Sequence, residues 1–129
     1  MSIWQYADRI TPIDSSNRVS LGEGQTPLVK SRHIGPRAGL RQLYFKLESL
    51  NPTGSFKDRF AAAGISCLLQ TGQRKCLTTS SGNAAAALAA YAASVRIHCQ
   101  VVILESTPAD KLARIQVCGA EISRIQGFG

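Results

Sequence analysis

The sequence has no long apolar run, and this absence excludes a membrane-spanning helix. Its longest apolar stretches, residues 84–93 and 99–104, are far shorter than the roughly 20 residues that such a helix needs. The N-terminus has no basic leader followed by a long apolar core, so the sequence predicts no signal peptide. We therefore expect a cytoplasmic protein with no membrane partner.

Paired cysteines are also missing. The four cysteines are far apart, and none belongs to the C-x-x-C pattern that is typical of zinc and redox sites. The sequence therefore predicts no metal site. Each cysteine lies in an apolar context, which predicts buried free thiols, as in a cytosolic protein. The four are Cys67, Cys76, Cys99 and Cys118.

Positive charge is in excess, but the basic residues are not clustered. The formal net charge is +7, which could indicate a nucleic-acid partner because Lys and Arg neutralise phosphates. However, the chain has no basic run of five residues, and its few aromatics do not interleave with the basic residues. We predict no nucleic-acid partner, and the charge instead favours an anionic small-molecule substrate.

The composition predicts a globular protein of about one domain in length. The 129 residues are 44% hydrophobic and 18% charged, without a low-complexity tract. Residues 1–42 contain several prolines and glycines, which predicts an irregular arm with a short helix near residues 3–10. Residues 42–50 predict a strand with Leu43, Phe45 and Leu47 on one face.

A turn and a helix follow the predicted strand. Residues 51–55 read NPTGS, in which a proline and a glycine are typical turn formers. Ser55 can cap the helix and Asp58, three residues later, can complete a capping box. Apolar residues then recur at helical spacing until Gly72, where the helix is expected to end.

From residue 76 onward the pattern alternates between strands and helices. An apolar middle strand without alternation is typical of a parallel strand covered on both faces. Thr107 and Asp110 predict a second capping box, with Pro108 at the first helical position and Gly119 after the last turn. We predict an α/β fold, a βαβαβ unit with a parallel sheet and flanking helices, preceded by the arm and the lysine-bearing helix. The expected strands are residues 76–79, 99–104 and 121–125, and the expected helices are residues 83–94 and 108–118.

One candidate binding site is the strand–turn–helix stretch TTSSGNAAAA at residues 78–87. Free N–H groups at a helix start, beyond the carboxyl end of a strand, form a place where open α/β sheets bind anions. The alternative is a capped helix with no ligand, because Ser and Asn are the preferred caps. The residues alone leave both interpretations open.

Lys57 is the second candidate, because it follows the turn directly and begins a helix. A helix start carries partial positive charge, so an ammonium group gains nothing there. A nucleophilic lysine must be uncharged, and the field of the helix alone is too weak to achieve this. Burial against Phe56 or a cofactor would have to contribute the rest. The alternative is a solvated surface lysine.

Two further features carry no predicted chemistry. The stretch LGEGQTPL at residues 21–28 contains a G-x-G, yet Pro27 follows and no helix opens there, so we expect a loop and no dinucleotide site. His33 and His98 have no partner motif, and neither is expected to be catalytic.

Four motifs together resemble a known family. LGEGQTPL, KLESLNPTGSFKDR, TTSSGNAAAALAAYAA and PADKLARIQVCGAEI occur in the order and approximate spacing found in threonine synthase and its relatives. These are the fold type II, or tryptophan synthase β-like, pyridoxal-phosphate (PLP) enzymes. The resemblance extends from Leu21 to Gly127, and four linked motifs are far more specific than any one of them.

The resemblance implies roles for individual residues. Lys57 is the lysine that holds PLP covalently and then moves protons, while Phe56 packs beside the cofactor ring. Asn83 resembles the asparagine that donates a hydrogen bond to the phenolic oxygen of the cofactor. Ser81, Gly82 and Ala84, together with Asn83, lie where the family binds the α-carboxylate of the substrate.

The implied function is that of a PLP-dependent carbon–oxygen lyase. Threonine synthase converts O-phosphohomoserine to threonine and phosphate, and this anionic amino acid suits a basic chain. Related serine or threonine dehydratases and cysteate synthases share the lysine and asparagine motifs and stay open as alternatives. A non-catalytic α/β binding or regulatory remnant is the alternative from another class.

The resemblance also implies that the chain is an N-terminal portion. Residues 1–72 correspond to the arm and part of the large PLP domain, and residues 73–129 to most of the small α/β domain. The glycine-rich loop that cradles the cofactor phosphate comes later in the family, so we expect the isolated chain to be inactive. Completion by a homo-oligomer or by another chain stays open.

Overall fold

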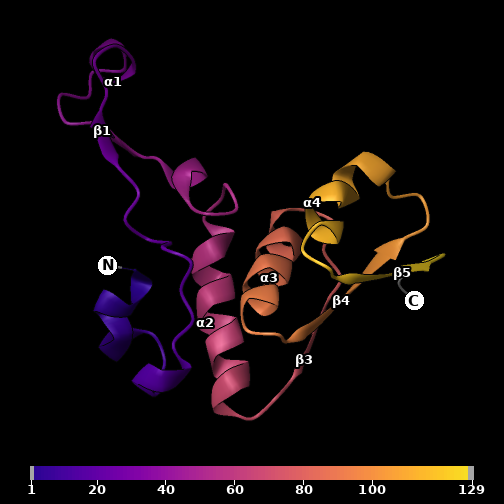
Figure 1. Ribbon diagram of the computed structural model, residues 1–129. Coiled ribbons are helices and arrows are strands. Elements are labelled where there is room, and N and C mark those ends of the chain that lie inside the picture. The colour runs from indigo at the N-terminus through magenta and orange to yellow at the C-terminus, as the bar shows by residue number, and fades with distance from the viewer. Residues whose placement is uncertain (1, 128–129) are drawn as a thin grey trace.

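The computed structural model describes residues 2–127. Its N-terminal part is an irregular arm that carries a small antiparallel hairpin, in which Val29 pairs with Phe45. The hairpin extends away from the rest of the molecule (Figure 1). The elements of this part are η1 (Ile3–Arg9), η2 (Ser15–Asn17), β1 (Leu28–Lys30), α1 (Ile34–Arg37), β2 (Tyr44–Lys46) and η3 (Glu48–Leu50).

The remainder of the chain is an α/β unit with a parallel sheet in the strand order β3-β4-β5. This arrangement confirms the predicted βαβαβ unit. Helices α2 and α3 lie side by side, and both begin at the same end of the molecule (Figure 1). The elements are α2 (Lys57–Gln70), β3 (Lys75–Thr78), α3 (Asn83–Ser94), β4 (His98–Leu104), η4 (Ala109–Leu112), α4 (Ala113–Gln116) and β5 (Glu121–Ile125).

The core lies between the helices and one face of the sheet. Cys99, Val101 and Ile103 of β4 are buried against the alanine-rich α3, whose small side chains let the helix approach closely. The intervening residues Gln100 and Val102 are only half-buried. The expectation that the middle strand is covered on both faces is therefore wrong for this chain, in which β4 alternates between a buried and a half-exposed face.

The strand predicted over residues 42–50 is shorter in the structure. Only Tyr44–Lys46 pair with another strand, and the chain then turns into η3. The side chain of Asn51 stabilises this turn, since its Nδ2 donates to the carbonyl of Glu48 at 2.9 Å. Phe45 is 39% exposed, so the apolar alternation does not line a buried face.

The helix predicted over residues 108–118 divides into η4 and α4. Pro108 has ψ 140 and stands before the helix as its N-cap, and no side-chain cap forms there, so the capping box at Thr107 is wrong. Leu112 and Ile115, which are 2% and 1% exposed, both reach the core. Residues three apart share a face in a 3₁₀ turn and in an α-helix alike, so both can be buried with the segment divided into η4 and α4.

The glycines at the helix ends and the cysteines can be compared with their predictions. Gly72 and Gly119 take φ of 73° and 74° where the preceding helices end, as expected. All four cysteines are free, as predicted, but only Cys99 is buried and Cys67 is exposed.

Within residues 2–127 there is no helix long and apolar enough to cross a membrane. No group of three metal-ligating side chains occurs in the same described part.

Candidate cofactor and substrate site

Lys57 is the first residue of α2, directly after the N-cap residue Phe56. Its N–H donates to Ser55 Oγ at 3.2 Å, but the N-cap position is occupied by Phe56 and not by Ser55 as predicted. The amine Nζ lies 4.7 Å from the centroid of the Phe56 ring, which is 58% exposed. Across the described part of the chain, Nζ has no hydrogen-bond or ion-pair partner. The amine is therefore not engaged by another polar group of the described residues, and the exposed Phe56 ring does not bury it.

Asp58 fixes the loop that precedes the lysine. Its buried carboxylate accepts hydrogen bonds from the N–H of Thr53 at 2.9 Å and from Thr53 Oγ1 at 2.7 Å. The predicted capping box is therefore wrong. Ser55 Oγ accepts from the N–H of Lys57 and not from that of Asp58, and the Asp58 carboxylate binds Thr53 and not the backbone of Ser55. A buried, fully bonded carboxylate holds a turn in one conformation.

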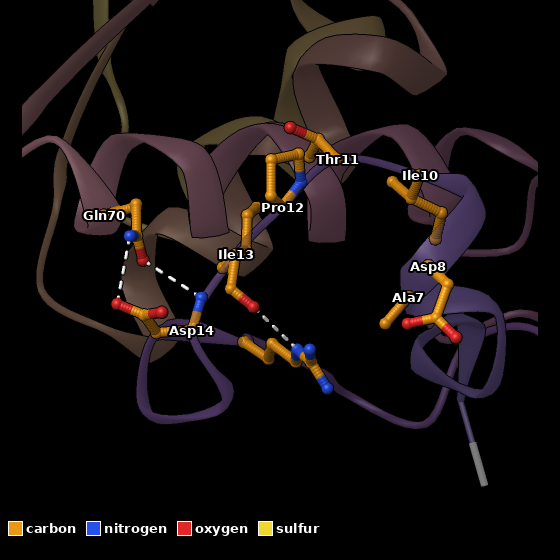
Figure 2. A pocket seen from close by; sticks show the side chains of 9 residues that line it. Ala7, Asp8, Ile10, Thr11, Pro12, Ile13, Asp14 and Gln70 are labelled. Atoms are coloured by element: carbon orange, nitrogen blue, oxygen red, sulfur yellow. Dashed lines mark hydrogen bonds between the residues drawn. The ribbon is translucent and has the colours of Figure 1, made fainter.

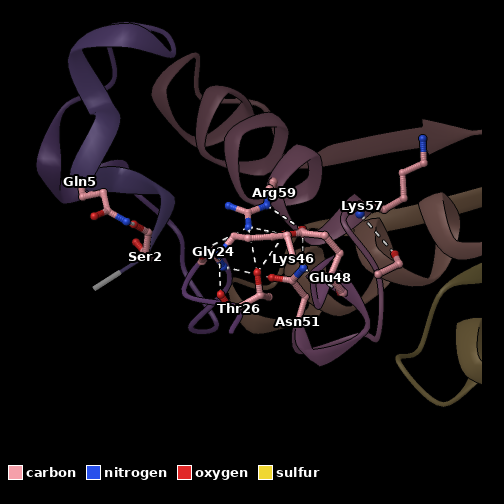
Figure 3. A network of polar contacts seen from close by, with 10 residues as sticks. Ser2, Gln5, Gly24, Thr26, Lys46, Glu48, Asn51, Lys57 and Arg59 are labelled. Carbon is pink, nitrogen blue, oxygen red and sulfur yellow. Dashed lines mark hydrogen bonds and ion pairs between the residues drawn. The ribbon is translucent and has the colours of Figure 1, made fainter. Parts of the chain in front are cut away.

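An ion pair ties α2 to the hairpin region. Arg59 donates to both carboxylate oxygens of Glu48, at 2.7 and 2.8 Å. Glu48 also accepts from Thr26 and Asn51. The guanidinium lowers the pKa of Glu48 from 4.5 to about 2, and the carboxylate in turn raises the pKa of Arg59. Figure 3 shows the Lys57 side chain extending away from this network.

The motif at residues 21–28 is anchored by Glu23. This fully buried carboxylate accepts from the hydroxyl of Tyr91 in α3 at 2.9 Å and from the N–H of Leu21 at 3.0 Å. Burial, together with the nearby carboxylate, raises the pKa of Tyr91. The N–H of Gly24 donates to Asn51 Oδ1 at 3.0 Å. The motif is therefore a structural loop, as expected, and its Gly24 N–H is not free to bind a phosphate.

The start of α3 is open by contrast. Gly82 is the N-cap residue, and no side chain caps the helix. Among residues 2–127, no group accepts a hydrogen bond from the N–H of Asn83 or Ala84. The N–H of Gly82 donates to Ser80 Oγ at 3.2 Å. A cavity of about 340 Å³ opens at this point and is lined by Ser81, Gly82 and Asn83.

The structure thus brings together part of the predicted site. Ser81, Gly82 and Asn83 share one cavity, while Lys57 and Phe56 lie at the start of the neighbouring helix and do not line it. Arg114 of α4 connects the two regions. Its Nη1 donates to Asn83 Oδ1 at 3.4 Å, and its Nη2 contacts the carbonyl of Thr53 in the lysine loop. Sequence reasoning did not single out Arg114, because nothing local marks it.

A second cavity lies elsewhere and contains no predicted site residue. It has a volume of about 460 Å³ and is formed by the N-terminal arm and Gln70, at the end of α2 that is remote from Lys57. Figure 2 shows Gln70 bonded to Asp14 at its edge, with Nε2 donating to Asp14 Oδ2 at 3.1 Å. The residues that were predicted to bind the cofactor or the substrate therefore favour the smaller cavity at α3 as the candidate site.

The residues present fit the ring end of PLP. The cofactor needs an accessible lysine amine and protein groups that tune its ring. Lys57 offers a partner-free amine, and Asn83 offers a carboxamide on the adjacent helix start. Open N–H groups at Asn83 and Ala84 suit a carboxylate.

Comparison with known proteins decides the family. Residues 19–128 match the family described as pyridoxal-phosphate dependent enzymes. The chain belongs to this family. The cofactor that the sequence predicts is therefore the cofactor of its family, and the α/β architecture is that of its fold type.

Curated relatives include several threonine synthases. The enzyme of Methanocaldococcus jannaschii is 37% identical over 128 residues, which are 98% of this chain and 32% of that protein. The enzyme of Mycobacterium bovis is 42% identical over 123 residues, which are 95% of this chain and 34% of that protein. The chain thus spans about one third of the length of the relatives that it matches.

Solved structures with the same fold include two racemases. Serine racemase from Dictyostelium discoideum has a TM-score of 0.72 at 36% identity, over 78% of this chain and 33% of its own. A PLP-dependent aspartate racemase has a TM-score of 0.70 at 34% identity, over 95% of this chain and 36% of its own.

Proposed function

We propose that this chain is the lysine- and asparagine-bearing part of a PLP-dependent lyase that resembles threonine synthase. The carrying observation is its 37–42% identity to threonine synthases over 95–98% of its length. The overall reaction is that of O-phosphohomoserine with water to give threonine and phosphate. The phosphate leaves from the γ carbon and water adds at the β carbon. The net charge of +7 suits this anionic substrate.

Lys57 has the central role in this proposal. PLP, when bound, supplies an electron sink that stabilises negative charge at the α carbon of the substrate. Lys57 Nζ would hold the cofactor covalently and would move protons at the substrate carbons. Phe56 covers one side of the amine, since its ring lies 4.7 Å from Nζ. The bonds of Asp58 and Ser55 hold the lysine in place.

The start of α3 has the complementary role of binding. Asn83 would donate from its side-chain amide to the phenolic oxygen of the cofactor and so would orient the ring. The unpaired N–H groups of Asn83 and Ala84, with Ser81 and Gly82 beside them, bind the α-carboxylate of the substrate. Holding this carboxylate fixes the α carbon relative to Lys57, which is how positioning lowers the barrier.

A second candidate is an amino-acid racemase. The observation that favours it is the structural likeness to serine racemase and aspartate racemase, at 36% and 34% identity. A racemase would use the same lysine to move a proton at the α carbon, with no leaving group. A dehydratase, a cysteate synthase and a non-catalytic remnant stay as further alternatives.

The test uses an enzyme assembled from this chain and the part of the Mycobacterium bovis threonine synthase that it does not cover. We expect threonine and phosphate to form from O-phosphohomoserine, and Lys57→Ala to abolish this activity. Lys75→Ala removes an exposed lysine at the start of β3 and is the matched control, with activity retained. The isolated chain is expected to be silent.

The alternatives predict different results in the same assay. Conversion of L-serine to D-serine without turnover of O-phosphohomoserine would favour the racemase. A folded, assembled protein without turnover of either substrate would favour the non-catalytic remnant.

A further inference from the structure

Arg114 lies between the two loops that the proposed function uses. It belongs to the short helix α4, 31 residues after Asn83 and 61 residues after Thr53. Its Nη1 donates to Asn83 Oδ1 and its Nη2 contacts the carbonyl of Thr53. A Cβ atom built on Gly54 would lie 3.6 Å from Nη2, so the guanidinium rests against the backbone of the lysine loop.

The chemistry of the two side chains fixes the orientation of the carboxamide. An asparagine side chain has one acceptor oxygen and an NH₂ group with two donors, which have nearly the same shape. Arginine has only donors, so it can form a hydrogen bond with the carboxamide only when Oδ1 faces the guanidinium. The NH₂ group of Asn83 then points the other way, and in the described part of the chain it has no acceptor.

The surroundings show where this NH₂ group is available. Asn83 and Arg114 line the same cavity of about 340 Å³, together with Ser81 and Gly82. Without Arg114, Oδ1 could turn toward the cavity and repel an anionic or oxygen acceptor. Among the described residues that line this cavity, Asp110 carries the only other charge, and its carboxylate accepts hydrogen bonds and cannot replace the donor.

We infer that Arg114 is a positioning residue that orients the carboxamide of Asn83, so that its NH₂ group is presented to an acceptor oxygen in the cavity. The inference rests on the proposed function, in which that acceptor is the ring oxygen of the cofactor. The bridge to Thr53 couples this orientation to the lysine loop. A lysine at position 114 would not suffice, because one ammonium group cannot span both acceptors as a planar fork does.

The contact can be tested without cofactor. The chain has three asparagines, Asn17, Asn51 and Asn83, so labelling asparagine with ¹⁵N gives three side-chain NH₂ signals, and loss of one signal in Asn83→Ser assigns that of Asn83. We expect Arg114→Met and Arg114→Lys both to shift the Asn83 signal more than the signals of Asn17 and Asn51. The Asn51 signal reports folding, since this amide is bonded to Glu48.

Arg41→Met is the matched control, because Arg41 is an exposed arginine of the hairpin region and its loss changes the net charge equally. It should leave the Asn83 signal in place. An unmoved Asn83 signal in Arg114→Met, with the Asn51 signal intact, would overturn the inference.

A second readout uses the assembled enzyme loaded with PLP. The pH midpoint at which the absorbance of the bound cofactor changes should shift in Arg114→Met in the same direction as in Asn83→Ala, and by less. The double variant should match Asn83→Ala alone, because the arginine acts through the asparagine. A double variant that shifts further by the full effect of Arg114→Met would contradict this. Failure to bind PLP would count against the proposed function, whereas the amide signal tests the inference separately.

Discussion

The N–H groups of Lys57, Asp58 and Arg59 at the start of α2 all have acceptors, namely Ser55 Oγ and the carbonyls of Ser55 and Phe56. The corresponding groups of Asn83 and Ala84 at the start of α3 have none within residues 2–127. The first four N–H groups of any helix need a partner from outside it. In α2 the protein supplies these partners itself, whereas in α3 they are left for solvent or a ligand.

The side chains show the same contrast. The lysine loop is held by the buried carboxylate of Asp58 and by the ion pair of Glu48 with Arg59. The asparagine loop is held mainly by an exposed contact with Arg114. In the proposed function Lys57 forms a covalent bond and has to be held in a defined place, whereas the start of α3 binds and releases substrate and has to keep its donors open. Disturbing the two helix starts should therefore have unequal effects on stability.

The largest expected effect on stability is that of Asp58→Ala. The change removes a fully buried carboxylate and leaves the N–H and hydroxyl of the half-buried Thr53 without acceptors, which should lower the free energy of unfolding by about 2–4 kcal/mol. Denaturant unfolding measures this. Asp8→Ala removes an exposed carboxylate and is the control, expected to change it by less than about 0.5 kcal/mol. Equal effects of the two changes would remove the basis of the comparison.

A smaller effect is expected from Glu48→Gln, and it should depend on pH. The pKa of Glu48 is lowered from 4.5 to about 2, mainly by Arg59, so its contribution is fully present above pH 4.5 and is lost as the pH falls toward 2. The Arg59 and Glu48 side chains are 31% and 27% exposed, so solvent screens the pair. We expect a loss of about 1–2 kcal/mol at pH 7.

Unfolding of both proteins from pH 7 to pH 2 checks this prediction. The difference between Glu48→Gln and the unchanged chain should shrink between pH 4.5 and pH 2. A difference that is constant across this range would mean that the carboxylate charge is not what stabilises the hairpin against α2.

The smallest effect on stability is expected from Asn83→Ala. Asn83 is exposed and caps nothing, so the free energy of unfolding should change by less than about 0.5 kcal/mol. In the assembled enzyme the cofactor should stay attached while turnover falls, because in the proposed function the asparagine orients the ring and is not the attachment point. Thermal unfolding and the absorbance of the bound cofactor measure the two parts. A loss of stability as large as that of Asp58→Ala would contradict the open character of the α3 start.

Local sequence patterns predicted the elements that are governed by local rules. Strand–helix alternation from residue 76 onward predicted the parallel sheet, and Gly72 marked the end of α2 because only a residue tolerant of positive φ fits there. Residues 108–118 were predicted wrongly as one helix, since Pro108 stays extended with ψ 140 and the turn that follows it is 3₁₀. The division between residues 72 and 73 stays a prediction.

The candidate site divides in a similar way. Lys57 and Asn83 were predicted because they lie within contiguous motifs, and their roles stay predictions. Arg114 was missed because it meets Asn83 from 31 residues away. The ion pair of Arg59 with Glu48 also joins residues of different elements, 11 apart in sequence. Such long-range contacts depend on the packing of α2, α3 and α4, which no local pattern encodes.

The most direct measurement for the account as a whole is the location of the cofactor linkage. Reduction of the PLP-loaded, assembled enzyme with borohydride makes the linkage permanent, and peptide mapping then identifies the modified lysine. The account predicts cofactor on Lys57, at one per chain, and none in Lys57→Ala. Cofactor on Lys46 or Lys75 instead would contradict the assignment of Lys57 as the lysine that binds the cofactor covalently.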